Sequence, residues 1–288
     1  MSIERIAVLG AGIMGRGIAY ASAVAGFDTT LYDAAPGALE KGLAEIHSLM
    51  DRGITAGKLP IDARDQSRIV ARADFDKACR DADLVIEAIP EDMKLKCETF
   101  RRLDALTAPA TILATNTSSL SVTEMAGATK RPGNVVGMHF FNPVHRMRLL
   151  EVVKGLETTP DTIEKVSVVG MRMGKEAVVV REAPGFVTTR INALIGNEAF
   201  RMLEEGVAGA RDIDKALKLG LNHPMGPFEL VDLVGLDTRL SILTFLHETL
   251  GERYRPNNLM VQYVKAGRLG KKAGRGVYEY GEGAGHGG

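Results

Sequence analysis

The sequence predicts an α/β fold in two parts, an N-terminal doubly wound domain followed by a smaller all-α C-terminal domain. Over roughly the first 180 residues, short apolar β-rich runs alternate with helical patterns, which is typical of a parallel sheet covered on both faces. A glycine-rich turn follows the first of these runs. After Ala183-Pro184-Gly185 the pattern is helical throughout, so we place the domain boundary between residues 1–183 and 184–288.

The N-terminal domain begins with a predicted strand at Ile6–Leu9, followed by a helix of small residues through Ala25. Further strands are predicted at residues 29–32, 84–86, 111–114 and 135–138, and residues 149–153 and 177–180 are candidates to extend the sheet. Residues 37–70 resemble two helices around a turn that contains Gly53, Gly57 and Pro60. We expect this segment to form a helical arm attached to the sheet.

The C-terminal domain is predicted to consist of helices at residues 191–205, 212–219, 228–250 and 259–266. Asp212 and Asp214 stand where the second helix is expected to begin, and acidic side chains are favourable at the positive end of a helix. The glycine-rich segment Gly281–Gly288 is expected to be a mobile tail.

The bulk composition excludes several classes of function. Lys plus Arg and Asp plus Glu each number 36, so no overall field attracts nucleic acid or an anionic membrane. The sequence has neither a secretory signal pattern nor a long apolar span. Its two cysteines, Cys79 and Cys97, are not spaced as CxxC, which argues against a disulfide framework or a metal site. We therefore expect a cytoplasmic protein without a bound metal.

Gly10-Ala11-Gly12-Ile13-Met14-Gly15 directly follows the first strand and opens a helix. In a Rossmann-type turn, the first glycine allows the tight turn, the second lets the backbone approach a pyrophosphate, and the third lets helix and strand pack closely. The helix N-terminus faces the negative charge. The alternative is a glycine-rich turn without a ligand. Because strand, loop, helix and second strand occur in the required order, we assign Gly10, Gly12, Ile13, Met14 and Gly15 to a dinucleotide site.

Asp33 ends the second predicted strand, where an acidic side chain would accept hydrogen bonds from the adenosine ribose hydroxyls. A carboxylate there would repel a 2′-phosphate, and the following Ala34-Ala35 provides no arginine to bind one. The alternative is a solvated aspartate in a turn. The sequence therefore favours NAD over NADP.

A polar cluster lies on segments that otherwise resemble buried strands: His139 is followed by Glu151, and Asn116 and Ser118 precede it. His139 has three possible roles: a core histidine satisfied by the backbone, a metal ligand, or a general base. A metal ligand needs partners, and the sequence contains no His-x-x-His pair or cysteine cluster. For a base, Glu151 would fix the tautomer and stabilise the imidazolium, while Ser118 would bond the reacting oxygen. Beside a hydride cofactor, this set suits alcohol–ketone interconversion.

Several sequence motifs of this chain resemble motifs of the 3-hydroxyacyl-CoA dehydrogenases, in particular those of the short bacterial 3-hydroxybutyryl-CoA dehydrogenase type. The resemblance extends over nearly the whole chain. The motifs are Gly10–Gly15, Glu87-Ala88-Ile89-Pro90-Glu91, Asn116-Thr117-Ser118-Ser119-Leu120, His139-Phe140-Phe141-Asn142-Pro143, Leu150-Glu151-Val152, Pro184-Gly185-Phe186-Val187, Pro224-Met225-Gly226-Pro227-Phe228-Glu229-Leu230 and Gly235-Leu236-Asp237-Thr238.

The resemblance implies roles for individual residues. His139 would exchange the proton of the 3-hydroxyl group, Glu151 would orient it, and Ser118 would bind the substrate oxygen beside the nicotinamide, with Asn116 also assigned to the substrate. The residues that match NAD-contacting positions are Glu91, Lys96, Ser118, Asn142 and Lys272; without the resemblance, Glu91, Lys96, Asn142 and Lys272 would be taken for solvated polar residues.

Three further expectations follow from the resemblance. Arg52 and Lys58 on the arm would contact the phosphates of an acyl-CoA. The alternative is that they only form part of a solvated helix face. Thr189 stands where many members have an asparagine as a fourth active-site group, and a hydroxyl is shorter than an amide. The helical domain would also form a homodimer interface.

The resemblance implies an NAD-dependent enzyme that interconverts an (S)-3-hydroxyacyl-CoA, of short chain, and the 3-oxoacyl-CoA. One alternative is a related NAD-dependent dehydrogenase of a free hydroxy acid or sugar acid. The other is a non-catalytic NAD-binding protein, which would keep the glycine loop without needing a base such as His139.

Overall fold

The computed structural model describes residues 2–35 and 37–281. The chain divides into two compact units, Met1–Ala183 and Pro184–Gly288. Each unit has a hydrophobic core of its own. Among the described residues, no helix has the length and apolar character needed to cross a membrane. Within the same residues, no group of three or more His, Cys, Asp or Glu side chains could hold a metal ion.

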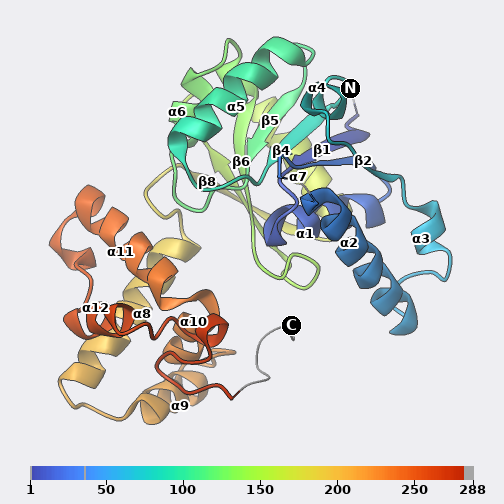
Figure 1. The fold of residues 1–288 in the computed structure, drawn as a ribbon. Helices are drawn as coiled ribbons and strands as arrows, with labels where there is room; N and C mark the ends of the chain where they lie inside the picture. Colours follow the sequence, from blue (N-terminus) through green and yellow to red (C-terminus); the bar gives the residue numbers. More distant parts are fainter. Residues whose placement is uncertain (1, 36, 282–288) are drawn as a thin grey trace. The chain divides into compact units, whose positions relative to one another are not determined.

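The first unit is built on one eight-stranded sheet with the order β3-β2-β1-β4-β5-β6-β7-β8 (Figure 1). The strands from β3 to β6 are parallel, β7 runs antiparallel to β6, and β8 runs parallel to β7. Their bounds are β1 Arg5–Leu9, β2 Asp28–Tyr32, β3 Ile69–Ala71, β4 Leu84–Glu87, β5 Ile112–Thr115, β6 Val135–Phe140, β7 Leu149–Lys154 and β8 Glu176–Arg181.

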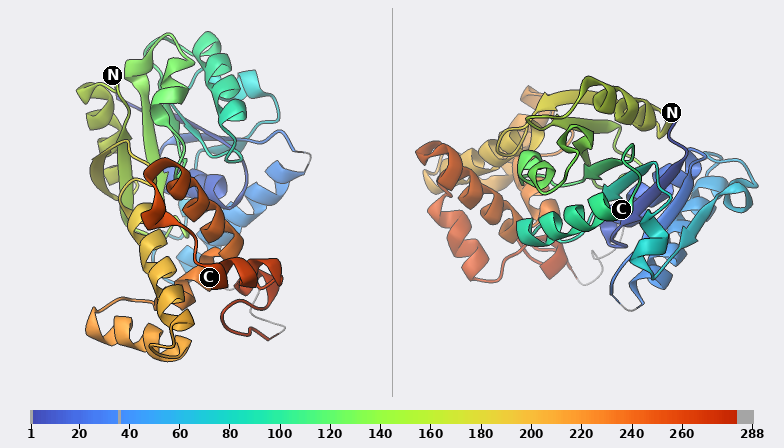
Figure 2. Two further views of the ribbon diagram at one scale, coloured as in Figure 1. Left: turned by 90° about the vertical axis from the view of Figure 1, so that its left-hand side faces the viewer. Right: turned by 90° about the horizontal axis from the view of Figure 1, so that it is seen from above.

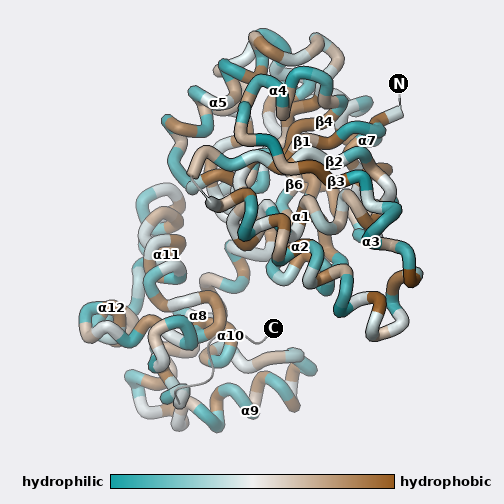
Figure 3. The backbone as a smooth tube through the Cα atoms, turned by 45° about the vertical axis from the view of Figure 1, so that its right-hand side comes forward, coloured by the Kyte–Doolittle hydropathy of each residue, from teal (hydrophilic) through white to brown (hydrophobic). Residues whose placement is uncertain are grey.

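Helices cover both faces of this sheet. Side chains of α1, α2 and α7 belong to the same hydrophobic cluster as β1, whereas α5 lies on the opposite face (Figure 2). The central strands β1 and β4 are largely hydrophobic, as expected for strands buried on both faces of the sheet (Figure 3). The helices of this unit are α1 Ile13–Val24, α2 Ala38–Thr55, α3 Ala63–Gln66, α4 Phe75–Cys79, α5 Met93–Leu106, α6 Val122–Gly127, the 3-10 turn η1 Pro132–Asn134 and α7 Pro160–Arg172.

The predicted strands and the predicted extension of the sheet by residues 149–153 and 177–180 are confirmed. The edge strand β3 and the short helix α4 were not expected from the sequence. β3 is only three residues long and largely exposed, so it lacks the continuous apolar run that marks the central strands. The predicted arm contains two helices, but the second, α3, has only four residues and the arm returns to the sheet at Ile69.

The second unit is helical, as predicted. Its elements are α8 Thr188–Glu204, α9 Ala210–Gly220, α10 Pro227–Val234, α11 Leu236–Leu250, η2 Glu252–Tyr254, α12 Asn258–Lys265 and η3 Lys271–Ala273. The prediction of one helix over residues 228–250 is wrong, because Gly235 adopts a φ of 102° and breaks it into α10 and α11. A side-chain-bearing residue rarely adopts that conformation.

The sequence suggested that Asp214 stabilises the beginning of its own helix, but the structure gives it a different role. Its buried carboxylate accepts hydrogen bonds from the backbone N–H groups of Phe228 (2.8 Å) and Glu229 (3.1 Å), and from the hydroxyl of Tyr278 (2.7 Å). It therefore caps the first turn of α10 from a neighbouring helix. Of the predicted mobile tail, residues 282–288 lie outside the described part of the chain.

Candidate active site

Many of the predicted site residues of the first unit lie at or just after the carboxyl ends of β1, β2, β4, β5 and β6, whereas Glu151 lies within β7 and Arg52 and Lys58 lie on the arm. Because these strands are parallel neighbours, their carboxyl ends meet at one edge of the sheet. Ligands of doubly wound folds bind at this edge, outside the ends of the strands.

A cavity of about 990 Å³ lies at this edge around the glycine loop. A side chain at Gly10 would collide with the carbonyl oxygen of Ala88 at 2.5 Å, and one at Gly15 with the carbonyl oxygen of Gly10 at 1.7 Å. Around Gly12, by contrast, no atom lies within 4 Å of the position of an added Cβ. The loop therefore combines two tight packing positions with open space, and this arrangement fits a pyrophosphate approaching the backbone.

Asp33 lines the same cavity, as do Ile13 and Met14. Its carboxylate accepts hydrogen bonds from the backbone N–H groups of Ala11 and Ala35, both at 2.7 Å. A carboxylate has about four acceptor positions, so two such bonds leave capacity for ribose hydroxyls. Asp33 is therefore held in place rather than solvated, and the cavity suits the adenosine end of a dinucleotide.

Sequence reasoning missed one wall of this cavity, which is formed by α5. Leu95, Glu98, Thr99 and Arg102 line it at helical spacing, together with Phe75. The Arg102 guanidinium lies 3.9 Å from the centre of the Phe75 ring and donates to Asp76 at 2.7 Å. The spacing of i, i+3, i+4 and i+7 along one helix face was the available signal.

His139 and Glu151 are direct neighbours across β6 and β7. His139 Nδ1 lies 2.7 Å from Glu151 Oε2, and the two residues are 6% and 1% exposed. The His139 and Phe141 rings are 4.4 Å apart between centres. A buried imidazole bonded to a carboxylate has a defined orientation and can take up a proton that the carboxylate stabilises. Of the roles considered for His139, the general base is the one that this geometry suits.

The turn after β5 reaches the histidine strand through Asn116, whose Oδ1 accepts a hydrogen bond of 2.9 Å from the backbone N–H of Phe140. In the same turn, the backbone N–H of Ser118 donates to Glu91 Oε1 at 3.2 Å. Asn142 follows β6 and precedes a cis peptide bond to Pro143. The structure thus places Asn116, Ser118, Glu91 and His139 at one edge of the sheet.

Lys96 is buried rather than solvated, contrary to what its residue type alone suggests. It is 1% exposed, and its ammonium nitrogen lies 2.5 Å from Glu87 Oε1 and 3.3 Å from Glu91 Oε2. Glu87 Oε2 accepts from the Thr115 hydroxyl at 2.7 Å, and Glu91 accepts from the Thr117 hydroxyl. Burial raises the pKa of Glu87, and the charge of Lys96 opposes this effect. These contacts join the turn after β4 to the turn that carries Ser118.

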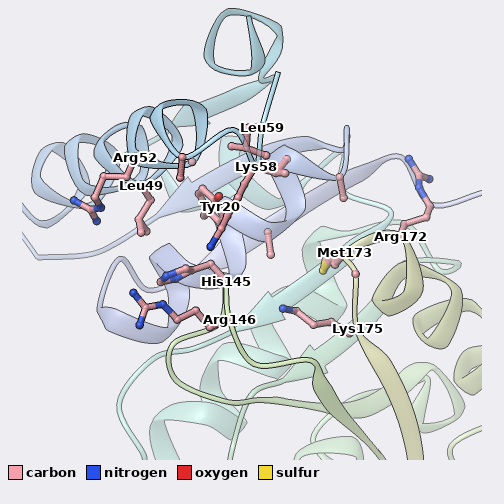
Figure 4. Close-up of a pocket in the computed structure, with 16 residues that line it drawn as sticks. Tyr20, Leu49, Arg52, Lys58, Leu59, His145, Arg146, Arg172, Met173 and Lys175 are labelled. Atoms are coloured by element: carbon pink, nitrogen blue, oxygen red, sulfur yellow. The ribbon is translucent and has the colours of Figure 1, made fainter. Parts of the chain in front are cut away.

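Arg52 and Lys58, predicted to meet phosphates, line a second cavity of about 540 Å³ between the arm, α1, the loop after β6 and the turn that joins α7 to β8 (Figure 4). Thr189 and Lys272 lie in the second unit. Thr189 is in the first turn of α8, and Lys272 Nζ donates to Asp237 Oδ2 at 2.7 Å. Their contributions to the site remain predictions.

Comparison with known proteins gives a consistent result over the whole chain. Residues 5–183 match the NAD binding domain of 3-hydroxyacyl-CoA dehydrogenase, and residues 185–280 match its C-terminal domain. A Bacillus subtilis protein named probable 3-hydroxybutyryl-CoA dehydrogenase is 47% identical over 286 residues, covering 98% of this chain and 99% of its own. The 3-hydroxybutyryl-CoA dehydrogenase of Bradyrhizobium diazoefficiens is 43% identical, with 96% of each chain covered.

A solved structure shows the same similarity in three dimensions. The (S)-3-hydroxybutyryl-CoA dehydrogenase of Ralstonia eutropha superposes with a TM-score of 0.94 at 41% identity, covering 98% of this chain and all of its own. The matches span both units, including the glycine loop and the His139–Glu151 pair. The chain therefore belongs to the 3-hydroxyacyl-CoA dehydrogenase family.

Proposed function

We propose that this protein interconverts a short-chain (S)-3-hydroxyacyl-CoA, with 3-hydroxybutyryl-CoA as the reference substrate, and the corresponding 3-oxoacyl-CoA in an NAD-dependent reaction. The observation that carries the proposal is the buried His139–Glu151 pair, at 2.7 Å, on strands that end beside the dinucleotide loop. The names of the relatives support the choice of substrate, since several of them are 3-hydroxybutyryl-CoA dehydrogenases.

In the oxidative direction, His139 takes the proton of the 3-hydroxyl group. Because Nδ1 is engaged with Glu151, we assign the proton transfer to Nε2. Glu151 then stabilises the imidazolium that forms, and the Ser118 hydroxyl donates a hydrogen bond to the substrate oxygen. In the reductive direction, His139 returns the proton to that oxygen. NAD, when bound, supplies the hydride acceptor or donor.

The turn after β4 positions the reacting groups. Glu91 accepts hydrogen bonds from the backbone N–H of Ser118 and from the hydroxyl of Thr117. Lys96 forms an ion pair with Glu91. We therefore assign Glu91 and Asn142 to contact with the cofactor, and Lys96 to orienting Glu91. Lys272 of the second unit is assigned to the cofactor on the resemblance alone.

The acyl-CoA phosphates are assigned to Arg52 and Lys58, which line a cavity without any acidic side chain among its described lining residues. A free hydroxy acid would not need this cavity. The comparison that tests the proposal is turnover of acetoacetyl-CoA against free acetoacetate and gulonate, each with NADH. We expect turnover of the thioester to dominate. If the free acids are reduced and the thioester is not, the CoA assignment is wrong.

A non-catalytic NAD-binding protein would also keep the glycine loop. It would not need a histidine held by a buried carboxylate beside a serine turn, and this observation favours an enzyme. Absence of turnover with every hydroxyacyl and oxoacyl substrate, together with measurable NADH binding, would support the non-catalytic alternative.

Thr189 is assigned to the substrate in place of the asparagine found in many members. Its hydroxyl offers one donor and reaches less far than an amide. We expect Thr189→Asn to lower the KM for acetoacetyl-CoA, with Thr189→Val as the variant that removes the hydrogen bond and keeps the shape. If Thr189→Val behaves as the wild type, this residue does not contact the substrate.

We also propose a homodimer through the helical unit. Several of its large apolar side chains are exposed, among them Val187, Ile191, Leu219, Leu221 and Leu233. Exposed apolar side chains in this number mark an interaction surface when they are contiguous. Light scattering coupled to size-exclusion chromatography should give twice the chain mass of 31.0 kDa. A single chain mass at micromolar concentration would refute the dimer.

A further inference from the structure

The turn after β5, residues 116–121, carries Ser118 and is held by a carboxylate at each end; we call it the Ser118 turn. Near its beginning, Glu91 accepts a hydrogen bond of 3.2 Å from the backbone N–H of Ser118. At its end, the hydroxyl of Ser121 donates to Glu182 Oε1 at 2.5 Å. The second carboxylate lies 61 residues further along the chain than its partner, and no sequence pattern connected the two.

Both carboxylate oxygens of Glu182 are engaged where the Ser118 turn passes into α6. Glu182 Oε2 accepts a hydrogen bond of 2.8 Å from the backbone N–H of Thr123 and another from the Thr123 hydroxyl. Hydrogen bonds to an ionised acceptor are stronger than those between neutral groups, and a negative charge is favourable at the N-terminus of a helix. Glu182 therefore fixes the point at which the turn ends and the helix begins.

The backbone of Glu182 is fixed as well. Its N–H donates to the carbonyl of Lys154 at 2.9 Å, which continues the pairing of β8 with β7 by one residue. Three residues later, the carbonyl of Gly185 already accepts from the N–H of Arg190, within the second unit, at 2.8 Å. Glu182 thus joins the Ser118 turn to the end of the sheet, at the place where the chain leaves the first unit.

A helix cap alone does not account for this arrangement. Ser121 already caps α6, because its hydroxyl oxygen accepts from the backbone N–H of Glu124 at 3.0 Å. The comparable cap of α7, Thr159, donates its own hydroxyl proton to the backbone carbonyl of Gly133 at 3.2 Å. In α6 the cap residue donates to a charged side chain instead, and this side chain also holds Thr123.

We propose that Glu182 is a positioning residue of the active site. It fixes the end of the Ser118 turn, as Glu91 fixes its beginning, and thereby keeps the Ser118 hydroxyl in place for the substrate oxygen. The inference rests on the proposed function, which gives that hydroxyl its hydrogen bond to the substrate. Because a small displacement of a reacting group lowers a rate strongly, release of one end of the turn should reduce kcat.

A double-mutant cycle with Ser118 separates positioning from a general structural role. Glu182→Gln keeps the shape of the side chain, but its amide NH₂ group cannot accept, so the contacts of one oxygen are lost. We expect it to lower kcat for acetoacetyl-CoA reduction about tenfold in the wild-type background and less than about twofold in the Ser118→Ala background. Without the hydroxyl, its misplacement costs nothing. Equal losses in both backgrounds, or no loss in the first, would overturn the proposal.

Hydrogen exchange tests the anchor independently of turnover. In Glu182→Gln, amides in a peptide covering residues 116–124 should exchange at least about tenfold faster than in the wild type. Glu164→Gln, which changes an exposed glutamate of α7, is the matched control and should leave this peptide unaffected. If the wild type does not reduce acetoacetyl-CoA, the proposed function fails, and the exchange of this peptide alone decides about the anchor. Unchanged exchange in Glu182→Gln would overturn it.

Ser121→Ala tests the same contact if Glu182→Gln does not fold. It removes the donor to Glu182 together with the cap of α6, whereas Thr159→Ala removes a hydroxyl cap from α7. Both variants should lose stability to a similar degree. Only Ser121→Ala should lower kcat, and this loss should disappear in the Ser118→Ala background. A wild-type kcat in Ser121→Ala, or an equal loss of kcat in Thr159→Ala, would contradict the positioning role of Glu182.

Discussion

Lys96 Nζ lies 2.5 Å from Glu87 Oε1, and both side chains are almost completely removed from solvent, at 1% and 0% exposure. Lys96 also contacts Glu91, which accepts a hydrogen bond from the backbone N–H of Ser118, so the pair is linked to the turns that carry both residues. Buried ion pairs contribute little net stability compared with an apolar pair of similar size, but the loss of one partner leaves an uncompensated charge. The pair is therefore expected to orient the site more than to stabilise the fold.

A double-mutant cycle separates these two roles. Glu87→Gln and Lys96→Met should each lower the free energy of unfolding by about 3–5 kcal/mol, because Lys96→Met leaves the buried Glu87 charge without its cation and Glu87→Gln leaves Lys96 with only the more distant Glu91. The double variant should recover most of that stability. Its kcat for acetoacetyl-CoA reduction should stay low, since Glu91 loses its cation and Ser118 its support. Full recovery of both stability and kcat would contradict the positioning role.

Asp33 should determine the choice between NADH and NADPH. Its carboxylate is fixed by the N–H groups of Ala11 and Ala35 and would face a 2′-phosphate directly. Asp33→Asn keeps an acceptor but removes the charge, so the ratio of kcat/KM for NADH to that for NADPH should fall about tenfold or more. The exposed Asp65 is the control, and Asp65→Asn should not alter the ratio. A ratio that Asp33→Asn leaves unchanged would show that the carboxylate does not select the cofactor.

Arg239 on α11 is a further buried charge, at 3% exposure, and burial lowers its pKa to about 10. Within the described part of the chain its Nε has no hydrogen-bond partner. Replacing a buried guanidinium whose Nε lacks a partner with an apolar side chain of similar length should stabilise the fold, so we expect Arg239→Met to raise the Tm. A Tm that falls by several degrees would mean that the guanidinium has a partner.

Glu151 acts through His139. Glu151→Gln retains a hydrogen-bond acceptor but no longer stabilises an imidazolium, and hydrogen bonds to charged groups contribute about 1.5–3 kcal/mol. We therefore expect kcat for acetoacetyl-CoA to fall about 10- to 100-fold, with little change in the KM for NADH. A change in KM alone, at constant kcat, would assign Glu151 to substrate binding instead.

The strands and the active-site chemistry could be predicted from the sequence for a common reason. Central strands of a doubly wound sheet are continuous apolar runs, so polar residues at their ends stand out, as His139 and Asn116 do. The antiparallel pairing of β6 with β7, which places Glu151 beside His139, was not predicted as such. The sequence pointed to the carboxylate because it lies within an apolar segment and because Leu150-Glu151-Val152 is part of the family resemblance.

Contacts between distant segments could not be predicted. Lys96 resembles a solvated lysine in the sequence, and only the fold of the turn after β4 reveals that it is paired with Glu87. His145 and Arg146 meet the arm because the loop after β6 packs against α1, where a side chain at Gly17 would contact Val144 at 2.9 Å. No local pattern carries that information. Likewise, the helical pattern continues through Gly235, and only the backbone conformation shows the break.

The central claim is that His139 exchanges a proton with the substrate oxygen. Its most direct test is kcat for acetoacetyl-CoA reduction by NADH in His139→Gln, with NADH binding measured by fluorescence to show that the cofactor site is intact. Positioned proton transfer contributes about 10²- to 10⁴-fold to a rate, so we predict a loss of that size with NADH affinity unchanged. A kcat within about threefold of the wild type would contradict the account.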